Sequence, residues 1–479
     1  MTATAPSSPV APPTTDLRVV LDRLKDAQRK HGAPSFDERV RRLDRLKSAL
    51  MRRKGAVVAA ISRDFGNRSS HETLGAEVFG VLSAIRHAKV RMRDWMETEE
   101  RDVGWVFLPA DARVIPQPAG VVGIISPWNY PVLLSLSPLV GALAAGNRAM
   151  LKPSELAPET AALLRDLVAE AFAEDEVVVV PGGPEVGELF SHLPFDHLFF
   201  TGSTRVGKLV ARAASENLVP VTLELGGKSP VIIGPGISIR TAAERIMAGK
   251  LFNAGQTCIA PDYVMIHPDV REAFIAGCRE AVAKMYPSLD RSPDYTSIIS
   301  DGHLARLRNC VRDAQSHGAR IVELNPAQEK FESSRKLVPM LVLDPNDEML
   351  VLKEEIFGPL LPVLAYRHLD EAIAYVNAHP RPLALYYFGD DREAIGRVIS
   401  ETMSGAVTIN ETLLHAMQED LPFGGIGSSG FGQYHGREGF DAFTKKKPIF
   451  HQSRLSARAL MRPPYGKTAS MLLRLLTGK

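Results

Sequence analysis

Short, uniformly apolar runs alternate with helix-length segments through most of this 479-residue chain. Within these runs polar residues do not alternate with apolar ones, which indicates strands that are buried on both faces. Helical patterns such as that of residues 159–172 separate consecutive runs. Buried strands that alternate with helices are typical of βαβ units, so the chain is predicted to contain parallel sheets. The first set of runs comprises residues 121–125, 149–151, 177–180 and 198–200.

A second set of similar units follows Leu225, which predicts a fold of two doubly wound α/β domains. The domains are expected to join near residues 224–228, where Gly226 and Gly227 permit a tight backbone path. Ligand sites favour such interfaces between domains. The runs of the second set are residues 231–233, 264–266, 341–343, 383–388 and 406–409.

Helices and a hairpin are expected before the first sheet. Apolar residues recur at helical spacing over residues 17–24, and Ser35 begins a capping-box pattern that predicts a second helix. A third helix is predicted for residues 72–96. Residues 103–107 and 113–116 flank a turn-like Leu-Pro-Ala-Asp segment, which predicts a protruding hairpin.

The composition and the chain ends favour a cytoplasmic protein without stable membrane association. Residues 1–16 are rich in Pro, Ser, Thr and Ala and are expected to form a disordered tail rather than a signal peptide. Residues 471–476 are apolar but short, so a docked terminal helix is favoured over a membrane anchor. A net charge of +2 is too small to produce the positive electrostatic field that nucleic-acid binding needs. The three cysteines suit a reducing compartment.

Cys258 lies in the most informative segment, Phe-Asn-Ala-Gly-Gln-Thr-Cys258-Ile-Ala. A buried structural cysteine is the ordinary interpretation, and we adopt it for Cys278 and Cys310, which lie in helix-like stretches. Cys258 instead follows small and polar residues that are typical of a turn. Such a turn can expose the sulfur as a nucleophile and leave the backbone N–H free to stabilise an oxyanion.

Glu224 stands between two leucines in a strand-like run, which indicates a buried carboxyl with a raised pKa, in the range of a general base. An ion pair with Lys228 is an equally good interpretation of the same residues. Asn129 follows a strand within Ser126-Pro-Trp-Asn129-Tyr-Pro. Its amide could donate to an oxyanion, or it could simply form a turn.

Two further strand ends suggest a phosphate or ribose site. Residues 200–208 follow a strand and begin a helix, so their backbone N–H groups could bind a pyrophosphate. Leu209 stands where a P-loop requires Ser or Thr, and the chain has no Gly-x-Gly-x-x-Gly motif. Lys152 and Glu155 could bind a ribose, although their segment could also be a surface loop.

These segments, in this order, resemble the aldehyde dehydrogenase superfamily over about residues 17–466. The matching motifs are Pro-Trp-Asn129, Lys152-Pro-Ser-Glu155, Phe-Thr-Gly202-Ser-Thr-x-Val-Gly207, Leu-Glu224-Leu-Gly-Gly-Lys, Gly-Gln-Thr-Cys258, Glu354-Glu355-Ile-Phe357-Gly-Pro and Pro422-Phe-Gly-Gly. The segments around His415 and Tyr434 are similar to class-3 members. Those around Arg68 and Ala260 are similar to bacterial coniferyl aldehyde dehydrogenases. A lysine that other classes carry after Phe-Gly-Gly-x is absent here, so their C-terminal substrate contacts are not transferred.

The resemblance implies that Cys258 attacks an aldehyde as a thiolate, in a site that lowers the thiol pKa. The Asn129 amide and the Cys258 N–H would hold the oxyanion, hydride would pass to a nicotinamide, and Glu224 would activate water to hydrolyse the thioester. No metal is implied. The implied cofactor-binding residues are Ser126, Pro127, Trp128, Lys152, Ser154, Glu155, Gly202, Ser203, Gly207, Leu225, Gly226, Glu355 and Phe357.

Glu155 favours NAD, because a carboxylate suits a free 2′-hydroxyl and repels a 2′-phosphate, although NADP is possible. Coniferyl aldehyde is the expected substrate, followed by medium-chain aliphatic aldehydes and benzaldehydes. Alternatives are a relative that transfers the acyl group to CoA or phosphate, and a non-catalytic protein on the same fold. Glu224 argues against the first, and the presence of Cys258, Asn129 and Glu224 argues against the second.

The resemblance also implies an aldehyde dehydrogenase fold with a small β oligomerisation element and a homodimer. The dinucleotide-binding domain would comprise residues 17–100 and 117–224, and the catalytic domain residues 225–429. The oligomerisation element would comprise residues 101–116 and 430–455, followed by a C-terminal extension of residues 456–479.

Overall fold

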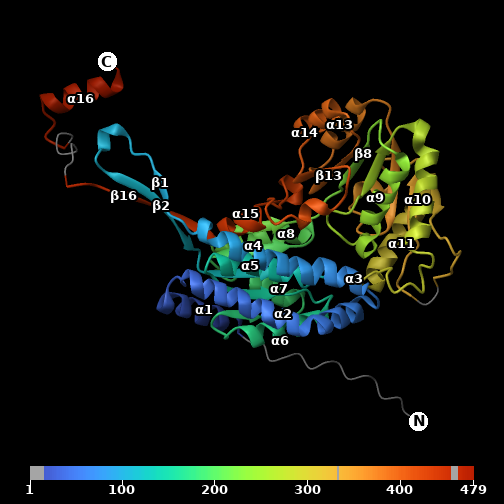
Figure 1. Cartoon of the computed structure of the whole chain (residues 1–479), viewed down its shortest axis with the longest axis horizontal. Helices are drawn as coiled ribbons and strands as arrows, with labels where there is room; N and C mark the ends of the chain where they lie inside the picture. Colours follow the sequence, from blue (N-terminus) through green and yellow to red (C-terminus); the bar gives the residue numbers. More distant parts are fainter. Residues whose placement is uncertain (1–15, 332–333, 455–461, 479) are drawn as a thin grey trace, which may run out of the picture.

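The computed structural model describes residues 16–331, 334–454 and 462–478, and Figure 1 shows two α/β units, a protruding arm and a C-terminal helix. The tail expected at residues 1–16 lies outside the described residues, apart from Asp16. The Asp16 side chain caps the first helix by accepting a hydrogen bond of 2.9 Å from the backbone N–H of Arg18.

The three predicted N-terminal helices are present. They are α1 (Leu17–His31), α2 (Phe36–Phe65) and a third that is divided into α3 (Ser70–Glu72), the π-helical turn η1 (Thr73–Val78) and α4 (Phe79–Trp95). Ser35 caps α2, because its Oγ accepts from the backbone N–H of Glu38 at 3.3 Å. A π-helical turn inside a helix is often found at a functional site, and this one lines the central cavity described below.

The first sheet has six strands in the order β15-β7-β6-β3-β4-β5, and β15 alone runs antiparallel to its neighbour. All four runs predicted in the first half of the chain are strands of this sheet. The strands are β3 (Val121–Ile125), β4 (Arg148–Lys152), β5 (Val177–Val179), β6 (His197–Thr201), β7 (Val221–Glu224) and β15 (Gly430–Phe431).

Helices cover both faces of this sheet, which explains why the central residues of its strands are mainly apolar. Val122 and Ile124 of β3 pack into one core with α2, α5 (Leu133–Ala144) and α6 (Pro158–Ala171). Val121 and Ile125 face the opposite side, in a core with α1, α7 (Pro184–Ser191) and α8 (Thr204–Glu216). Successive residues of a strand point to opposite faces, so a strand between two helical layers has no face that is exposed to solvent.

The second sheet has seven strands in the order β10-β11-β12-β9-β8-β13-β14. Its five predicted strands are confirmed, and two were not predicted. The half-exposed β10 pairs antiparallel at one edge, and Pro362 interrupts the apolar run of β12. The strands are β8 (Pro230–Ile233), β9 (Tyr263–Ile266), β10 (Arg320–Glu323), β11 (Met340–Leu343), β12 (Leu360–Ala365), β13 (Ala384–Phe388) and β14 (Ala406–Ile409).

Helices also cover both faces of the second sheet. One face packs against α9 (Ile239–Leu251), α10 (Arg271–Met285) and α11 (Asp301–Ser316), and the other against α13 (Leu369–Ala378) and α14 (Arg392–Glu401). Cys278 and Cys310 are buried inside α10 and α11, which confirms their structural assignment.

The protruding arm is a three-stranded sheet in the order β1-β2-β16 (Figure 1). Its strands are β1 (Glu99–Arg101), β2 (Asp111–Pro118) and β16 (Thr444–His451). The hairpin is therefore present, but the strand predicted at residues 103–107 is wrong. Residues Trp105–Phe107 form a 3₁₀ turn, since the N–H of Phe107 bonds back to the carbonyl of Gly104 at 2.8 Å instead of joining a ladder.

The expected boundary at residue 430 also differs from the structure. Residues Gly430–Phe431 pair with β7 of the first sheet, and α15 (Gly436–Ala442) packs on α4 and α5. Only β16 of this segment joins the arm. The chain thus crosses the first unit before it enters the arm, which places Tyr434 and His435 beside the central cavity.

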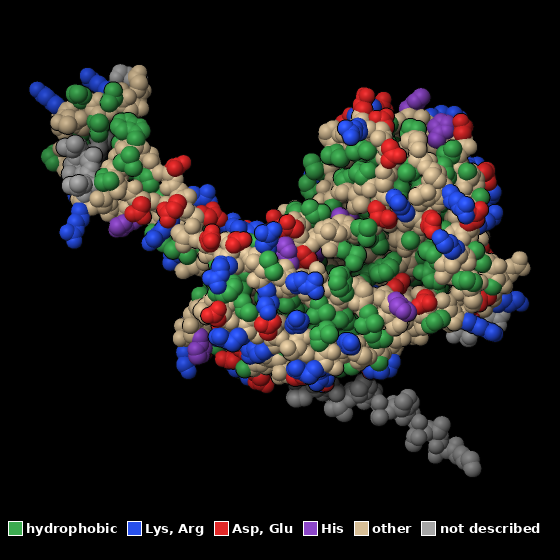
Figure 2. All heavy atoms as spheres, in the orientation of Figure 1, with side chains coloured by type: hydrophobic (Ala, Val, Ile, Leu, Met, Phe, Trp, Pro, Cys, Tyr) green, Lys and Arg blue, Asp and Glu red, His purple; other side chains and the backbone are tan. Residues whose placement is uncertain are grey.

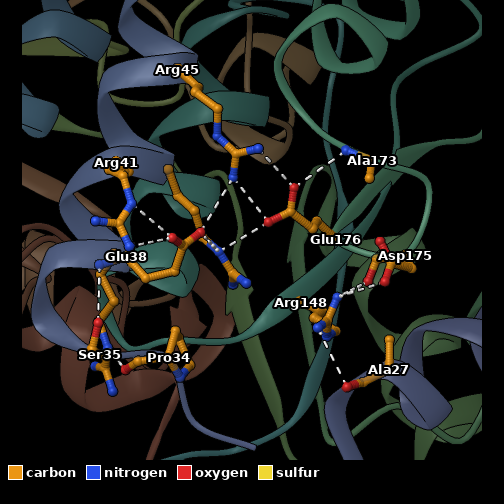
Figure 3. A network of polar contacts seen from close by, with 12 residues as sticks. Ala27, Pro34, Ser35, Glu38, Arg41, Arg45, Arg148, Ala173, Asp175 and Glu176 are labelled. Atoms are coloured by element: carbon orange, nitrogen blue, oxygen red, sulfur yellow. Dashed lines mark hydrogen bonds and ion pairs between the residues drawn. The ribbon is translucent and has the colours of Figure 1, made fainter. Parts of the chain in front are cut away.

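Arginine–carboxylate contacts fix the position of α2 beside the first sheet (Figure 3). Glu176, directly before β5, accepts two hydrogen bonds of 2.9 Å from Arg45 of α2. Arg42, one helical turn earlier, lies 3.2 Å from Glu176 and 3.3 Å from Glu38. A bidentate pair of this kind is directional, so it fixes the orientation of α2 as well as its contact with the sheet.

The C-terminal helix α16 (Lys467–Thr477) extends beyond the arm (Figure 1). The expectation that this helix docks on its own chain is wrong, because Met471 is 76% exposed and Leu475 is 72% exposed. Within the described residues, no helix is both long enough and apolar enough to cross a bilayer.

Candidate active site

Segments from both α/β units meet around a cavity of about 560 Å³. Cys258 and Glu224, predicted as nucleophile and base, both line this cavity. Most of its remaining wall is apolar and includes Phe79, Leu133 and Phe252. A cavity of this size between two domains is typical of a small-molecule site.

Cys258 follows a strained turn at the end of α9. Asn253 and Ala254 have left-handed backbone angles (φ 53° and 50°), and both are completely buried. The side chain of Gln256 stabilises the turn, because its Nε2 donates to the carbonyls of Asn253 and Ser297 at 3.0 Å. Strain that the surroundings enforce in this way is common at functional sites, and here it directs Cys258 towards the cavity.

The Cys258 thiol has a raised pKa in this structure. Burial and the nearby carboxyl groups of Glu355 and Glu224 raise it to about 12, although the backbone N–H groups of Cys258 and Ile259 oppose this shift. The expectation that the site lowers the thiol pKa is therefore wrong for the protein alone. Anionic sulfur is disfavoured by an apolar site that already contains two carboxyl groups.

Glu224 ends β7 and is 2% exposed. Within the described part of the chain, neither of its carboxyl oxygens has a hydrogen-bond partner, and burial raises its pKa well above the usual range. The alternative ion pair with Lys228 is not formed. Lys228 instead contacts Asp262 and donates to the carbonyl of Val351 at 2.7 Å. An unpaired buried carboxyl is unfavourable for folding, which indicates a chemical role.

Asn129 is buried at the end of the loop after β3. Its side-chain Nδ2 donates one hydrogen bond to the carbonyl of Gln256 at 3.2 Å, which brings the amide to the turn that carries Cys258. An amide nitrogen has two hydrogens, so one N–H remains for a ligand.

A buried ion pair holds the backbone of Asn129. The Nη1 of Arg68 donates to Oε1 of Glu77 at 2.7 Å and to the carbonyl of Asn129 at 2.9 Å, and neither charged side chain is exposed. The second oxygen of Glu77 accepts from the backbone N–H groups of Val132 and Leu133. Sequence reasoning missed both residues as members of the site, because no local pattern shows that they meet at this loop.

The predicted cofactor residues lie at the carboxyl ends of β3, β4, β6 and β7, and in the loop after α12 (Leu350–Lys353). The carboxyl ends of the strands are the edge at which open α/β sheets bind nucleotides. Three of these residues follow β3: Ser126, Pro127 and Trp128. The end of β4 carries Lys152, Ser154 and Glu155, and the start of α8 carries Gly202, Ser203 and Gly207. Leu225 and Gly226 follow β7, and Glu355 and Phe357 follow α12.

The contacts at this edge fit an extended polar ligand. Lys152 is 3% exposed, and its Nζ pairs with Oε2 of the more exposed Glu155 at 2.9 Å. The segment thus contains a fixed ion pair and is not a simple surface loop. Ser203 caps α8 through a 3.4 Å bond from the N–H of Val206, so the helix begins at the expected phosphate position.

Glu355 and Phe357 are the remaining predicted cofactor residues, and they lie near Cys258. Within the described residues Oε1 of Glu355 is buried without a partner, and burial and the charge of Asp262 raise its pKa to about 8. Its carboxyl lies directly over Gly226, where a Cβ atom would approach Oε2 to 2.0 Å. Phe357 packs edge-on against Trp128 with ring centroids 5.4 Å apart. An unpaired carboxyl oxygen near Cys258 could accept a hydrogen bond from a ribose hydroxyl.

The raised pKa of Cys258 makes its reactivity depend on pH. We expect iodoacetamide to modify Cys258 slowly near neutral pH and about tenfold faster for each unit up to about pH 10, because only the thiolate reacts. Peptide mass spectrometry would follow Cys258, with the buried Cys278 and Cys310 as internal controls. Rapid modification that does not change between about pH 7 and pH 9 would contradict the raised pKa.

Comparisons with known proteins agree with this geometry. The family model for the "Aldehyde dehydrogenase family" matches residues 13–449. A probable coniferyl aldehyde dehydrogenase of Pseudomonas aeruginosa is 50% identical over 95% of each chain, and a coniferyl aldehyde dehydrogenase of a Pseudomonas species is 49% identical over 95% of each chain. The structure of Staphylococcus aureus AldH in a substrate-bound state superimposes with a TM-score of 0.90 at 38% identity, covering 96% of this chain and 99% of that one. The family model, the relatives and the fold agree, and the chain belongs to the aldehyde dehydrogenase family.

Proposed function

We propose that this enzyme oxidises an aldehyde to the carboxylic acid with NAD, through a thioester on Cys258 that water hydrolyses. The observation that carries the proposal is the buried, unpaired carboxyl of Glu224 in the same cavity as Cys258. A thioester must be hydrolysed before the enzyme can turn over again, and a carboxyl with a raised pKa is a suitable general base for water.

The proposed reaction begins when the Cys258 thiol loses its proton to water and the thiolate sulfur bonds to the aldehyde carbon, as the carbonyl π bond breaks. The remaining Asn129 amide hydrogen and the Cys258 backbone N–H stabilise the negative charge on the former carbonyl oxygen. Bound nicotinamide supplies the oxidising chemistry by accepting hydride. Glu224 then removes a proton from water as water attacks the thioester, and the carbon–sulfur bond breaks to release the acid and the Cys258 thiol.

Substitutions of Cys258 and Glu224 should separate the two halves of the reaction. We expect Cys258→Ala to abolish NADH formation, and Glu224→Gln to lower turnover by about 10²- to 10⁴-fold while a thioester accumulates on Cys258. NADH absorbance and intact-protein mass spectrometry would measure these effects without CoA or phosphate. Cys278→Ala, a buried cysteine in α10, is the matched control and should retain activity.

Two outcomes would contradict this assignment. Equal NADH formation by wild type and Cys258→Ala would exclude Cys258 as the nucleophile. NADH formation that requires added CoA or phosphate, with acyl-CoA or acyl phosphate as the product in place of the acid, would instead support the acyl-transfer alternative.

The preference for NAD is proposed from Glu155, whose carboxylate pairs with Lys152 at the end of β4. We expect Glu155→Gln to lower the ratio of kcat/KM for NAD to that for NADP by about tenfold, because the repulsion of a 2′-phosphate is lost. Steady-state kinetics with both cofactors would measure the ratio. Glu159→Gln, which alters a nearby carboxylate paired with Arg63, should leave the ratio unchanged.

Coniferyl aldehyde is the substrate that we propose. Support comes from the names of the two Pseudomonas relatives and from the apolar, aromatic wall of the cavity. Medium-chain aldehydes and benzaldehydes are the next candidates. A volume of about 560 Å³ falls within the usual range for drug-sized ligands.

We also propose a homodimer with the arm in the subunit contact. Trp105 and Phe450 are 65% and 54% exposed, and Figure 2 shows hydrophobic side chains gathered on the arm and C-terminal helix. We expect the wild type to sediment as a dimer and Trp105→Glu/Phe450→Glu as a monomer. Leu218→Glu, at a 90% exposed site on the first unit, should remain dimeric. A monomeric wild type would contradict the proposal.

A further inference from the structure

We propose that Glu419 and His435 form a hydrogen-bonding subsite in the aldehyde cavity, which selects aldehydes that carry a hydroxyl group on an apolar body. The inference rests on the proposed aldehyde oxidation and specifies its substrate class. Both residues line the cavity that contains Cys258 and Glu224.

Glu419 differs from the other acidic side chains of this cavity. Glu72 accepts from the N–H of Asn253 at 3.1 Å, and Glu411 accepts from the N–H of Thr412 at 2.8 Å. Within the described residues, Glu419 has neither a hydrogen bond nor an ion pair, and burial raises its pKa to about 7. It is thus a half-buried carboxyl in the cavity wall that no described side chain or backbone group occupies, so it is available to a ligand.

Only one of the two cavities that Glu419 borders can hold a substrate. The smaller, about 20 Å³, lies between α4, α5 and α15 and has room for a single water molecule. The larger is the 560 Å³ cavity of the active site. A substrate-sized ligand that contacts Glu419 therefore fits the larger cavity, which Cys258 also lines.

His435 provides a second unsatisfied polar group. Its Nδ1 is buried, and no part of the chain that the structure describes bonds to it. Burial and the neighbouring His415 lower its pKa to about 4, so the imidazole is neutral at physiological pH. The His435 ring stacks on Phe423 with ring centroids 5.2 Å apart, which fixes its orientation. A neutral imidazole nitrogen can donate or accept a hydrogen bond, according to the tautomer.

Tyr434 connects this subsite to the catalytic pair. Tyr434, Glu224, Cys258 and Glu419 all line the same cavity, and burial, followed by the three other groups, raises the pKa of the Tyr434 phenol. Tyr434 is 3% exposed and packs edge-on against Phe423. The reacting centre and the subsite therefore share one wall of the cavity.

Glu419 and His435 suit a substrate hydroxyl better than they suit other polar groups of a substrate. A hydroxyl can donate to Glu419 and accept from His435, whereas a ketone or ether offers no donor. The surrounding Phe79, Leu133 and Phe252 suit an aromatic or unsaturated carbon skeleton. A site with buried hydrogen-bonding groups discriminates strongly against an analogue that lacks the partner.

A pair of aldehydes that differ by one hydroxyl tests the subsite. We would measure kcat/KM for 4-hydroxycinnamaldehyde and cinnamaldehyde, with hexanal as a reference, in wild type, Glu419→Gln and Glu419→Leu. We expect the wild type to prefer the hydroxylated aldehyde by at least about tenfold. Glu419→Gln should reduce this preference, and Glu419→Leu should bring it close to unity, with a larger loss of kcat/KM for the hydroxylated aldehyde than for cinnamaldehyde or hexanal.

Asp420→Asn is the matched control, because Asp420 is the adjacent carboxylate and its side chain is 77% exposed beside His87. It should retain the wild-type preference. A wild-type preference near unity, a preference that survives Glu419→Leu, or an equal loss for all three aldehydes would overturn the subsite. Turnover of none of the three by wild type would instead refute the proposed aldehyde oxidation itself.

Discussion

The buried ion pair between Arg68 and Glu77 is the interaction on which the active site depends. Arg68 binds the backbone of Asn129, while Glu77 binds the N–H groups of the next loop residues. Removal of one member of a fully buried pair leaves an uncompensated charge and costs about 3–5 kcal/mol. The pair therefore joins the π-helical turn to the loop after β3 and determines where the Asn129 amide lies.

The same helical stretch also supports the turn that carries the nucleophile. Glu72, five residues before Glu77, accepts from the N–H of Asn253 and from the hydroxyl of Thr296 at 2.9 Å. Both proposed oxyanion donors, the Asn129 amide and the Cys258 N–H, thus rest on residues 68–77. An oxyanion site requires donors that are fixed before the reaction, and the buried side chains of Arg68, Glu72 and Glu77 provide fixed contacts on two sides.

The two α/β units could be predicted from sequence because their strands are buried on both faces. In a run such as residues 121–125 every residue is apolar and buried, so the strand can be predicted without knowledge of the strands that pair with it. The prediction failed where tertiary contacts decide. The half-exposed β10 and the proline-containing β12 lack a continuous apolar run, and residues 103–107 form a 3₁₀ turn despite their apolar side chains.

In the candidate site, too, the residues with a local sequence pattern could be predicted, and the properties that depend on distant residues could not. Cys258, Glu224 and Asn129 could be identified because each has a distinctive local segment. The pKa values of Cys258 and Glu355 could not, because they depend on carboxyl groups from different segments that share one apolar space. Glu419 carries no sequence signal at all, since its significance lies in the absence of a partner within the described chain. Only the folded structure places it in the wall of the cavity that contains Cys258, and a substrate hydroxyl is the partner that we propose for it.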